Sequence, residues 1–328
     1  MTQPILEALT VSKSFALRDD GPRKGPKRFL KAVDQVSLSL APGETLGVAG
    51  ESGCGKSTLA KLLTGLLAPD SGTIHFEGND LQQLRLEQQR RFRRSVQMIF
   101  QDPFSSLNPR LRIGDAIAEP LLIHGLAHGN DCRLMATALM EQVGLSPELY
   151  DRFPHEFSGG QRQRIGIARA LAAQPTVLVA DEPVSSLDIS IQAQIINLLL
   201  ELKHHQGLSM VVISHDLAVL RHISDRIAVM YLGALVELAP ANELFKGYRH
   251  PYTEALLAAI PRLQSSDQHP PIRLQQEPAA ADGPPTGCRF HPRCHYAQDI
   301  CRQQAPPLQE QTPGHAAACH RSNELFKS

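Results

Sequence analysis

The stretch 50–57 reads G-E-S-G-C-G-K-S, which has the G-x-x-x-x-G-K-S spacing of a phosphate-binding loop. Glycines let backbone amides wrap a phosphate group, and a helix that begins behind them adds positive potential. We expect Lys56 to contact the β- and γ-phosphates and Ser57 to bind Mg²⁺. The alternative is a structural glycine turn. The predicted nucleotide-binding residues are Gly50, Ser52, Gly53, Cys54, Gly55, Lys56, Ser57 and Thr58.

Two carboxylates, Asp181 and Glu182, follow the apolar run 177–180. A buried strand would carry both to the carboxyl edge of a sheet, where nucleotides bind. We expect Asp181 to hold Mg²⁺, directly or through water. Glu182 is placed to polarise the attacking water, because phosphoryl transfer depends on an oriented nucleophile. Taken alone, the pair is equally well interpreted as an acidic strand end.

The surrounding sequence alternates between strand and helix patterns. Strands are expected at 36–40, 44–48, 96–100, 177–180, 210–213 and 227–231, and helices at 59–66 and 191–202. This alternation predicts an α/β fold with a mainly parallel sheet. From about 111 to 171 the pattern turns helical, with candidate helices at 113–123 and 133–143, which indicates an inserted helical subdomain.

Composition excludes several functional classes. Of 328 residues, 42% are hydrophobic, and 33 Lys and Arg balance 33 Asp and Glu, so no overall positive field favours nucleic acid. The first residues lack a signal-peptide pattern, and no run of about 18 uncharged apolar residues occurs. We therefore expect neither export nor a membrane span. The stretch 19–27 indicates a surface loop, and 275–285 a linker before a Cys-rich tail.

The stretch 157–164, F-S-G-G-Q-R-Q-R, resembles the signature of the ABC ATPase family. Ser158 is a candidate helix N-cap, and its hydroxyl and the next two amides would offer donors to an anion. Simple helix capping is the alternative. The resemblance implies that the anion is the γ-phosphate of ATP on the opposite subunit, with two ATPase domains sandwiching two nucleotides. The residues expected to act in trans are Ser158, Gly159, Gly160, Gln161 and Asp188.

Other positions match the family in order. Gln101 is similar to the Q-loop residue that senses Mg²⁺ and the membrane subunit, 185–188 resembles the D-loop, and His215 resembles the switch histidine at the γ-phosphate. For adenine stacking, Phe15 is the best match to the family's aromatic loop, with Phe29 as the alternative and a core role for either as a further reading. The resemblance implies ATP and Mg²⁺ as cofactors, Mg²⁺ at Ser57, Gln101 and Asp181, and catalysis by Lys56, Glu182 and His215.

Three segments, 100–109, 250–253 and 287–294, resemble the oligopeptide, dipeptide and nickel importers of this family. The resemblance implies a P-loop NTPase (ABC ATPase) domain at 1–260, with a helical subdomain at about 102–170 and an antiparallel N-terminal β-subdomain, and a small Cys-rich C-terminal region at 261–328. It implies ATP hydrolysis that drives dipeptide import across the bacterial inner membrane, with haem as an added cargo and longer oligopeptides or nickel as alternatives.

The same resemblance implies the partners and the place of work. The partners are a paralogous ATPase subunit that forms a heterodimer, two transmembrane permease subunits and a periplasmic peptide-binding protein, with no nucleic acid. The chain would sit peripherally on the cytoplasmic face of the inner membrane.

Four cysteines near the C-terminus, Cys288, Cys294, Cys301 and Cys319, have the spacing C-x5-C-x6-C-x17-C. A short Pro-rich segment builds little core, so a bound metal would help to order it. The spacing alone does not identify the metal. The family resemblance favours a [4Fe-4S] cluster, while the nearby His291, His295 and His320 keep Zn²⁺ as an alternative and four free thiols are the third reading.

The sequence argues against three other functions. A soluble ABC ATPase of translation or DNA repair would carry two cassettes or a coiled-coil insertion. A P-loop kinase or GTPase would need an acceptor site or an N-K-x-D guanine reader, and that tetrapeptide does not occur in the sequence. A regulatory binder without catalysis would lack part of the set Lys56, Asp181, Glu182 and His215, which is complete.

Overall fold

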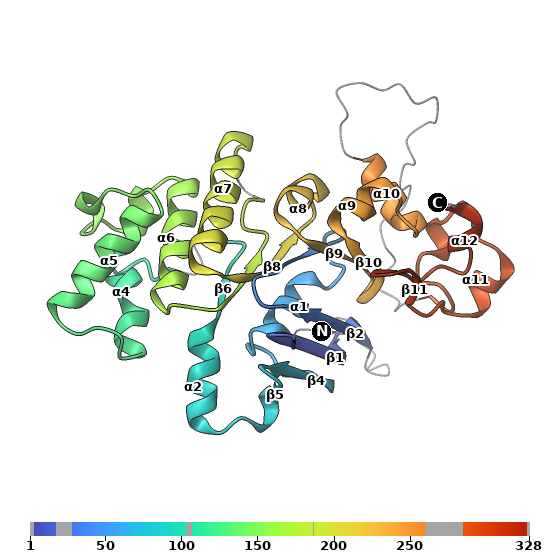
Figure 1. Cartoon of the computed structure of the whole chain (residues 1–328), viewed down its shortest axis with the longest axis horizontal. Helices are drawn as coiled ribbons and strands as arrows, with labels where there is room; N and C mark the ends of the chain where they lie inside the picture. The colour runs from blue at the N-terminus through green and yellow to red at the C-terminus, as the bar shows by residue number, and fades with distance from the viewer. Residues whose placement is uncertain (1–2, 18–27, 103–106, 186, 260–284, 327–328) are drawn as a thin grey trace, which may run out of the picture.

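A computed structural model describes residues 3–17, 28–102, 107–185, 187–259 and 285–326. Two sheets organise these residues (Figure 1). One has eight strands in the order β11-β12-β10-β9-β3-β8-β7-β6, and the other has four in the order β2-β1-β4-β5. The strands are β1 Leu6–Ala16, β2 Phe29–Leu40, β3 Thr45–Ala49, β4 Ser71–Phe76, β5 Asn79–Asp80, β6 Val96–Ile99, β7 Val177–Asp181, β8 Ser209–Ser214, β9 Arg226–Tyr231, β10 Ala234–Pro240, β11 Gln309–Thr312 and β12 His315–Ala317.

Strands β9, β3, β8, β7 and β6 of the larger sheet are parallel, and β10, β12 and β11 extend it in antiparallel fashion. The smaller sheet is antiparallel throughout. The predicted fold class, α/β with a mainly parallel sheet and an antiparallel N-terminal sheet, is confirmed. The helices are α1 Lys56–Leu63, α2 Leu86–Ser95, α4 Ile113–Ile123, α5 Asn130–Gln142, α6 Gly159–Ala172, α7 Ile189–Gln206, α8 Leu217–Ile223, α9 Ala241–Lys246, α10 Pro251–Ala258, α11 Asp299–Gln303 and α12 Ser322–Leu325.

The central strands β3, β7 and β8 of the larger sheet are buried on both faces. In β7 every residue is buried, and alternate side chains enter two different cores. Val177 and Val179 pack with α1 and the smaller sheet, whereas Leu178 and Ala180 pack with α6, α7 and α8. Two-sided burial explains why the strand is an unbroken apolar run rather than an alternating one.

Helices α4, α5 and α6 form the lobe at one end of the molecule, at the left of Figure 1. The predicted inserted helical segment thus corresponds to three packed helices between β6 and β7. The proposed limits at 102–170, and the boundary at 260–261, stay predictions. Among the described residues, no helix has both the length and the apolar character needed to cross a bilayer.

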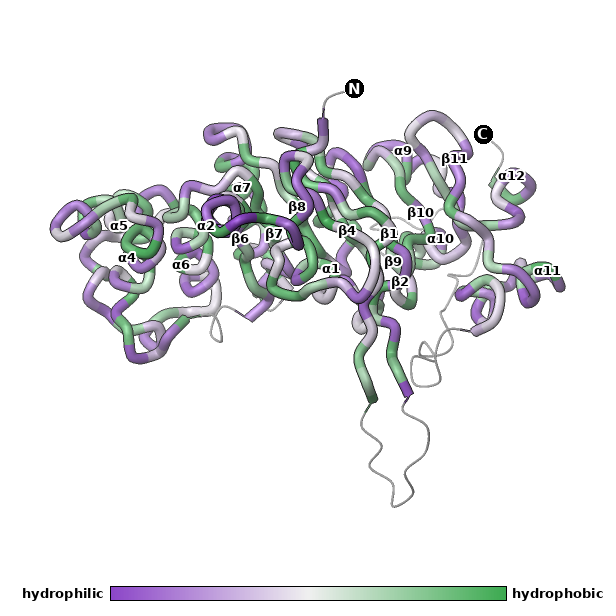
Figure 2. The backbone as a smooth tube through the Cα atoms, turned by 90° about the horizontal axis from the view of Figure 1, so that it is seen from below, coloured by the Kyte–Doolittle hydropathy of each residue, from purple (hydrophilic) through white to green (hydrophobic). Residues whose placement is uncertain are grey.

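Strands β1 and β2 form a two-stranded ribbon whose far end projects from the body in Figure 2. At that end Phe15 pairs with Leu30, and Ala16 pairs with Phe29. Both phenylalanine side chains are exposed. The loop predicted at 19–27, and the linker predicted at 275–285 apart from Pro285, lie outside the described residues.

The C-terminal segment is built into the main sheet. Strand β12 pairs with β10, Glu237 lying opposite Ala317 and Leu238 opposite Ala316. The buried carboxylate of Glu237 lies 2.7 Å from His315 Nε2 and accepts a hydrogen bond from the Arg249 backbone N–H at 2.5 Å. Strand pairing and the buried contact between His315 and Glu237 therefore fix this segment against the sheet.

His250, at the start of α10, makes folding sensitive to acid. The side chain is buried, its Nδ1 accepts from the Tyr252 N–H at 3.0 Å, and burial lowers its pKa from 6.5 to about 3. The folded state keeps the ring neutral, whereas the unfolded chain protonates it below pH 6.5. The stability lost through this residue grows as pH falls from 6.5 towards 3, and is about 2 kcal/mol at pH 5.

Urea unfolding at pH 7 and pH 5 tests this prediction. His250→Asn keeps a side-chain acceptor at the N-cap, and we expect its free energy of unfolding to fall by about 2 kcal/mol less between the two pH values than that of the wild type. The control is His222→Asn, at an exposed position of α8. Equal pH dependence in all three proteins would contradict the prediction.

Candidate functional site

The loop between β3 and α1, residues 50–55, depends on glycine at two positions. Gly50 has φ 153° and Gly55 has φ 106°. A Cβ at Gly50 would lie 2.3 Å from the Met230 carbonyl oxygen, and one at Gly55 would lie 1.9 Å from that of Ala32. Only glycine suits this backbone and this close approach. These glycines allow a tight connection between the buried strand β3 and the N-terminus of α1. A helix N-terminus of this kind is suited to bind phosphate.

Lys56 extends back into this loop. Its side chain is 4% exposed, and Nζ donates to the carbonyl oxygens of Gly50 at 2.8 Å and Glu51 at 2.9 Å. Cys54 lies beside it with Sγ 3.9 Å from Nζ, and burial raises the pKa of the Cys54 thiol. The loop carbonyl groups thus orient the ammonium group at the place where phosphate is expected to bind.

Ser57 and Asp181 are brought together from α1 and β7. Ser57 Oγ donates to Asp181 Oδ1 at 3.1 Å. Burial raises the pKa of the Asp181 carboxyl, and the hydrogen bond from Ser57 opposes this shift. A hydroxyl and a carboxylate side by side are the oxygen ligands that Mg²⁺ prefers, so the donor set fits the predicted metal.

The Glu182 carboxylate contacts side chains that follow neighbouring strands. Its Oε2 accepts from Gln101 Nε2 at 3.1 Å and lies 3.3 Å from His215 Nδ1, while its Oε1 lies 4.0 Å from Lys56 Nζ. Gln101 follows β6, Glu182 follows β7 and His215 follows β8. Parallel neighbouring strands end at one edge, which is why residues distant in sequence converge here.

Ser158 and its neighbours form a separate surface at the start of α6. The Gln161 N–H donates to Ser158 Oγ at 3.4 Å, and the Ser158 N–H donates to Gln161 Oε1 at 3.0 Å, which is a capping box. A Cβ at Gly160 would lie 2.6 Å from Ile191 Cγ2, so this turn packs against the start of α7, where Asp188 is the exposed N-cap residue. Among the described residues, the hydrogen bonds of this capping box stay within the start of α6 and do not reach Glu182.

The residue that stacks on adenine is still open between two phenylalanines. Phe15 and Phe29 are both exposed near the end of the β1–β2 ribbon, so a choice between them for adenine stacking stays a prediction. Ser186 of the predicted D-loop, and residues 103–106 of the segment after Gln101, lie outside the described residues.

The predicted [4Fe-4S] cluster is wrong. Cys288, Cys294, Cys301 and Cys319 line one cavity of about 20 Å³, which has room for little more than a water molecule. Within the described ranges no group of three or more His, Cys, Asp or Glu side chains is arranged to hold a metal ion, so Zn²⁺ is unsupported too. Burial raises the pKa of Cys294 to about 12 and that of Cys319 to about 11, so both thiols are protonated in the structure described.

Contacts to the loop from the C-terminal third were not predicted. The Glu51 N–H donates to Tyr252 Oη at 2.9 Å, and the Glu51 carboxylate pairs with Arg293 at 2.7 Å. Tyr252 and Arg293 lie in segments noted only for their family resemblance. No local pattern marks these contacts, because the partners are 201 and 242 residues apart.

Comparisons with known proteins agree with this geometry. Residues 33–185 match the family "ABC transporter", and 236–301 match "Oligopeptide/dipeptide transporter, C-terminal region". A probable peptide ABC transporter ATP-binding protein of Sinorhizobium fredii is 48% identical over 98% of the chain and 90% of its own length. The dipeptide transport ATP-binding protein of Escherichia coli is 45% identical over 97% and 95%, and the oligopeptide transport ATP-binding protein of Salmonella typhimurium is 49% identical over 92% and 90%.

Solved structures give the same answer for the fold. A dimeric ATP-binding cassette bound to ADP and Pi in a post-hydrolysis state superimposes with a TM-score of 0.64 and 28% identity over 72% of this chain and 98% of that one. CbiO1 of Clostridium perfringens, part of an ABC transporter complex, has a TM-score of 0.62 and 25% identity over 74% and 91%.

Proposed function

Because the chain belongs to the ATP-binding subunits of ABC transporters, in the group with the oligopeptide/dipeptide C-terminal region, we propose that it hydrolyses ATP to drive dipeptide import. The observation that carries the ATPase role is the convergence of Lys56, Asp181, Glu182 and His215 at one sheet edge, and the peptide cargo rests on the match of the C-terminal region. Haem is a further candidate cargo, and longer oligopeptides or nickel are the alternatives.

The geometry supports a division of roles in hydrolysis. The loop amides and Lys56 bind the phosphates, with Ser57, Asp181 and Gln101 as the ligands of Mg²⁺, which neutralises phosphate charge when bound. Glu182 orients the attacking water and accepts its proton as the bond from the γ-phosphorus to ADP breaks. His215, 3.3 Å from Glu182, is placed to contact the γ-phosphate.

A second ATPase subunit would complete the site. The start of α6 and the residue before α7 present a set of exposed or half-buried residues, namely Ser158, Gly159, Gly160, Gln161 and Asp188. The hydrogen bonds described above do not connect them to the Glu182 cluster. A helix N-terminus attracts anions, so this surface suits the γ-phosphate on a partner. One of the similar solved cassettes is a dimer. The proposed partner is a paralogous subunit.

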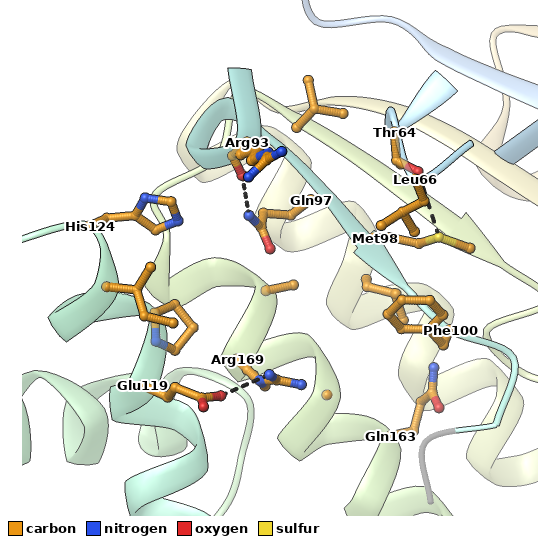
Figure 3. Close-up of a pocket in the computed structure, with 16 residues that line it drawn as sticks. Thr64, Leu66, Arg93, Gln97, Met98, Phe100, Glu119, His124, Gln163 and Arg169 are labelled. Atoms are coloured by element: carbon orange, nitrogen blue, oxygen red, sulfur yellow. Dashed lines mark hydrogen bonds and ion pairs between the residues drawn. The ribbon is translucent and has the colours of Figure 1, made fainter. Parts of the chain in front are cut away.

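A groove beside the site suits a membrane partner. It has a volume of about 300 Å³ and is lined by residues of α2, β6, α4 and α6 (Figure 3). Ile123 on its rim is 70% exposed, Phe100 is also exposed, and the Arg169–Glu119 ion pair of 2.8 Å forms part of the wall. Phe100 immediately precedes Gln101, which contacts Glu182, so an occupant of the groove would be linked to the catalytic cluster.

We propose that this groove binds a segment of a transmembrane permease subunit, of which the transporter has two. The chain would then lie at the cytoplasmic face of the inner membrane. A periplasmic peptide-binding protein would deliver the cargo from the other side.

Substitution of Ile123 by aspartate tests the docking assignment. A charge on the apolar rim opposes burial under a partner, so we expect co-purification with the permease subunits to fall at least about tenfold. Binding of ATP by the chain itself should be unchanged. Leu134→Asp, at an exposed leucine of α5 outside the groove, is the matched control. Normal complex formation by the Ile123 variant would refute the assignment.

Uptake by cells that lack this chain tests the function. Labelled dipeptide, a longer oligopeptide and nickel are offered after rescue with the wild type or with Glu182→Gln. We expect selective loss of dipeptide uptake that only the wild type restores. Loss of nickel or oligopeptide uptake instead would keep the ATPase role and change the cargo, and no loss of uptake would contradict the importer.

A further inference from the structure

Glu51, the second residue of the phosphate-binding loop, is held through three groups. Its carbonyl oxygen accepts from Lys56 Nζ at 2.9 Å, and its N–H donates to Tyr252 Oη at 2.9 Å. Its carboxylate pairs with Arg293, which lies in the C-terminal segment. The loop assigned to ATP is therefore tied to α10 and to a part of the chain 242 residues away.

The pair between Glu51 and Arg293 is bidentate. Arg293 Nη1 lies 2.7 Å from Glu51 Oε2, and Nη2 lies 2.8 Å from Oε1. The side chains are 6% exposed for Arg293 and 23% exposed for Glu51. Nη1 also donates to Tyr231 Oη at 3.4 Å. Two parallel charge-assisted hydrogen bonds at low exposure fix the geometry of both partners.

The same segment also supports the loop indirectly, through the turn between β9 and β10. Arg289 donates to the Leu232 carbonyl oxygen and lies 2.5 Å from Asp34 Oδ2. The next residue in the β9–β10 turn, Gly233, donates its N–H to the Cys54 carbonyl oxygen at 2.9 Å. Residues 289–293 thus support the loop directly at Glu51 and indirectly at Cys54.

We propose that Arg293 is a positioning residue for ATP binding, which neutralises Glu51 and fixes the second residue of the phosphate-binding loop. The inference rests on the proposed ATP site. A carboxylate in such a loop repels a polyphosphate unless a cation pairs with it. Loss of Arg293 would leave this negative charge uncompensated and remove one restraint on the loop. Both effects weaken phosphate binding, whereas the chemistry at Glu182 is untouched.

Titration calorimetry of the full-length chain with Mg²⁺ and the non-hydrolysable ATP analogue AMP-PNP tests the proposal. We expect Arg293→Gln to weaken binding about tenfold and to raise the KM for ATP by a similar factor, with kcat changed less than about twofold. Arg293→Lys, which keeps the charge without the planar fork, should be intermediate. Adding Glu51→Gln to Arg293→Gln should restore most of the affinity, because the uncompensated charge is gone.

Arg321→Gln is the matched control. Arg321 lies in the same segment but pairs with Glu324 at 2.8 Å and donates to the Tyr296 carbonyl oxygen at 3.0 Å, so the variant should bind like the wild type. A lower melting temperature of Arg293→Gln with unchanged affinity, or no rescue by Glu51→Gln, would overturn the proposal. Absence of binding by the wild type itself would refute the ATP site instead.

Discussion

Replacing Glu182 by glutamine is expected to slow ATP hydrolysis by about a hundredfold or more while ATP binding is kept. The amide fills the same space and keeps an acceptor towards Gln101, but it takes no proton from water. The lost charge lies near Lys56 and His215, at 4.0 and 3.3 Å. Affinity for ATP should therefore stay the same or rise, since less negative charge faces the phosphates.

Phosphate release by the assembled transporter, together with the dissociation constant for ATP, separates the two effects. Glu243→Gln, an exposed position on α9, is the control and should hydrolyse ATP at the wild-type rate. Near-normal turnover of Glu182→Gln would assign the general base elsewhere. Weak binding with normal turnover would place Glu182 in phosphate binding instead.

Replacing Gly55 by alanine is expected to abolish detectable nucleotide binding. The new methyl carbon would lie 1.9 Å from the Ala32 carbonyl oxygen, and the backbone has φ 106°, so the loop must move. Overpacking and backbone strain together cost about 3 kcal/mol or more. Both costs fall on the residue before Lys56, where the loop becomes a helix. Calorimetry with AMP-PNP and the midpoint of urea unfolding measure the two consequences.

Gly53→Ala in the same loop separates strain from collision. Gly53 also has a positive φ, 79°, but an added Cβ would meet no atom within 4 Å. Only the strain of a left-handed alanine applies, about 1–2 kcal/mol. We expect this variant to keep measurable binding with lower stability. Equal damage in both variants would show that the contact with Ala32 is unimportant.

The local arrangement of the candidate site was predictable from the sequence, whereas nucleotide binding by these residues stays a prediction. Residues 50–58 are contiguous in the sequence, and the apolar run before Asp181 is the buried strand β7. The local sequence was therefore enough to predict both the loop and the strand that places Asp181. The run at 191–202 lies within α7, whose ends extend beyond it on both sides. Interpretations of this kind succeed when the interacting residues are neighbours in sequence.

Other features of the fold and of the candidate site could not be predicted from the sequence, for physical reasons. Strand β1 contains a register shift between Ala8 and Val11, with Thr10 at φ 48°, and this bulge breaks the alternation that marks a strand. The contact between Glu51 and Arg293 is formed only by the tertiary fold. The family resemblance favoured a metal at the four cysteines, but the sequence contains no information on how little room the folded chain leaves between the thiols.

Strand β12 lies between β10 and the short, polar strand β11 at the rim of the main sheet. Without this hairpin, β10 would expose a row of unpaired backbone groups beside apolar side chains such as Val236 and Leu238. Open edges of this kind recruit strands from other molecules and lead to aggregation. We therefore expect the C-terminal hairpin to shield this edge from strand addition by other molecules, and proteolytic cleavage ahead of it to leave the subunit prone to aggregation.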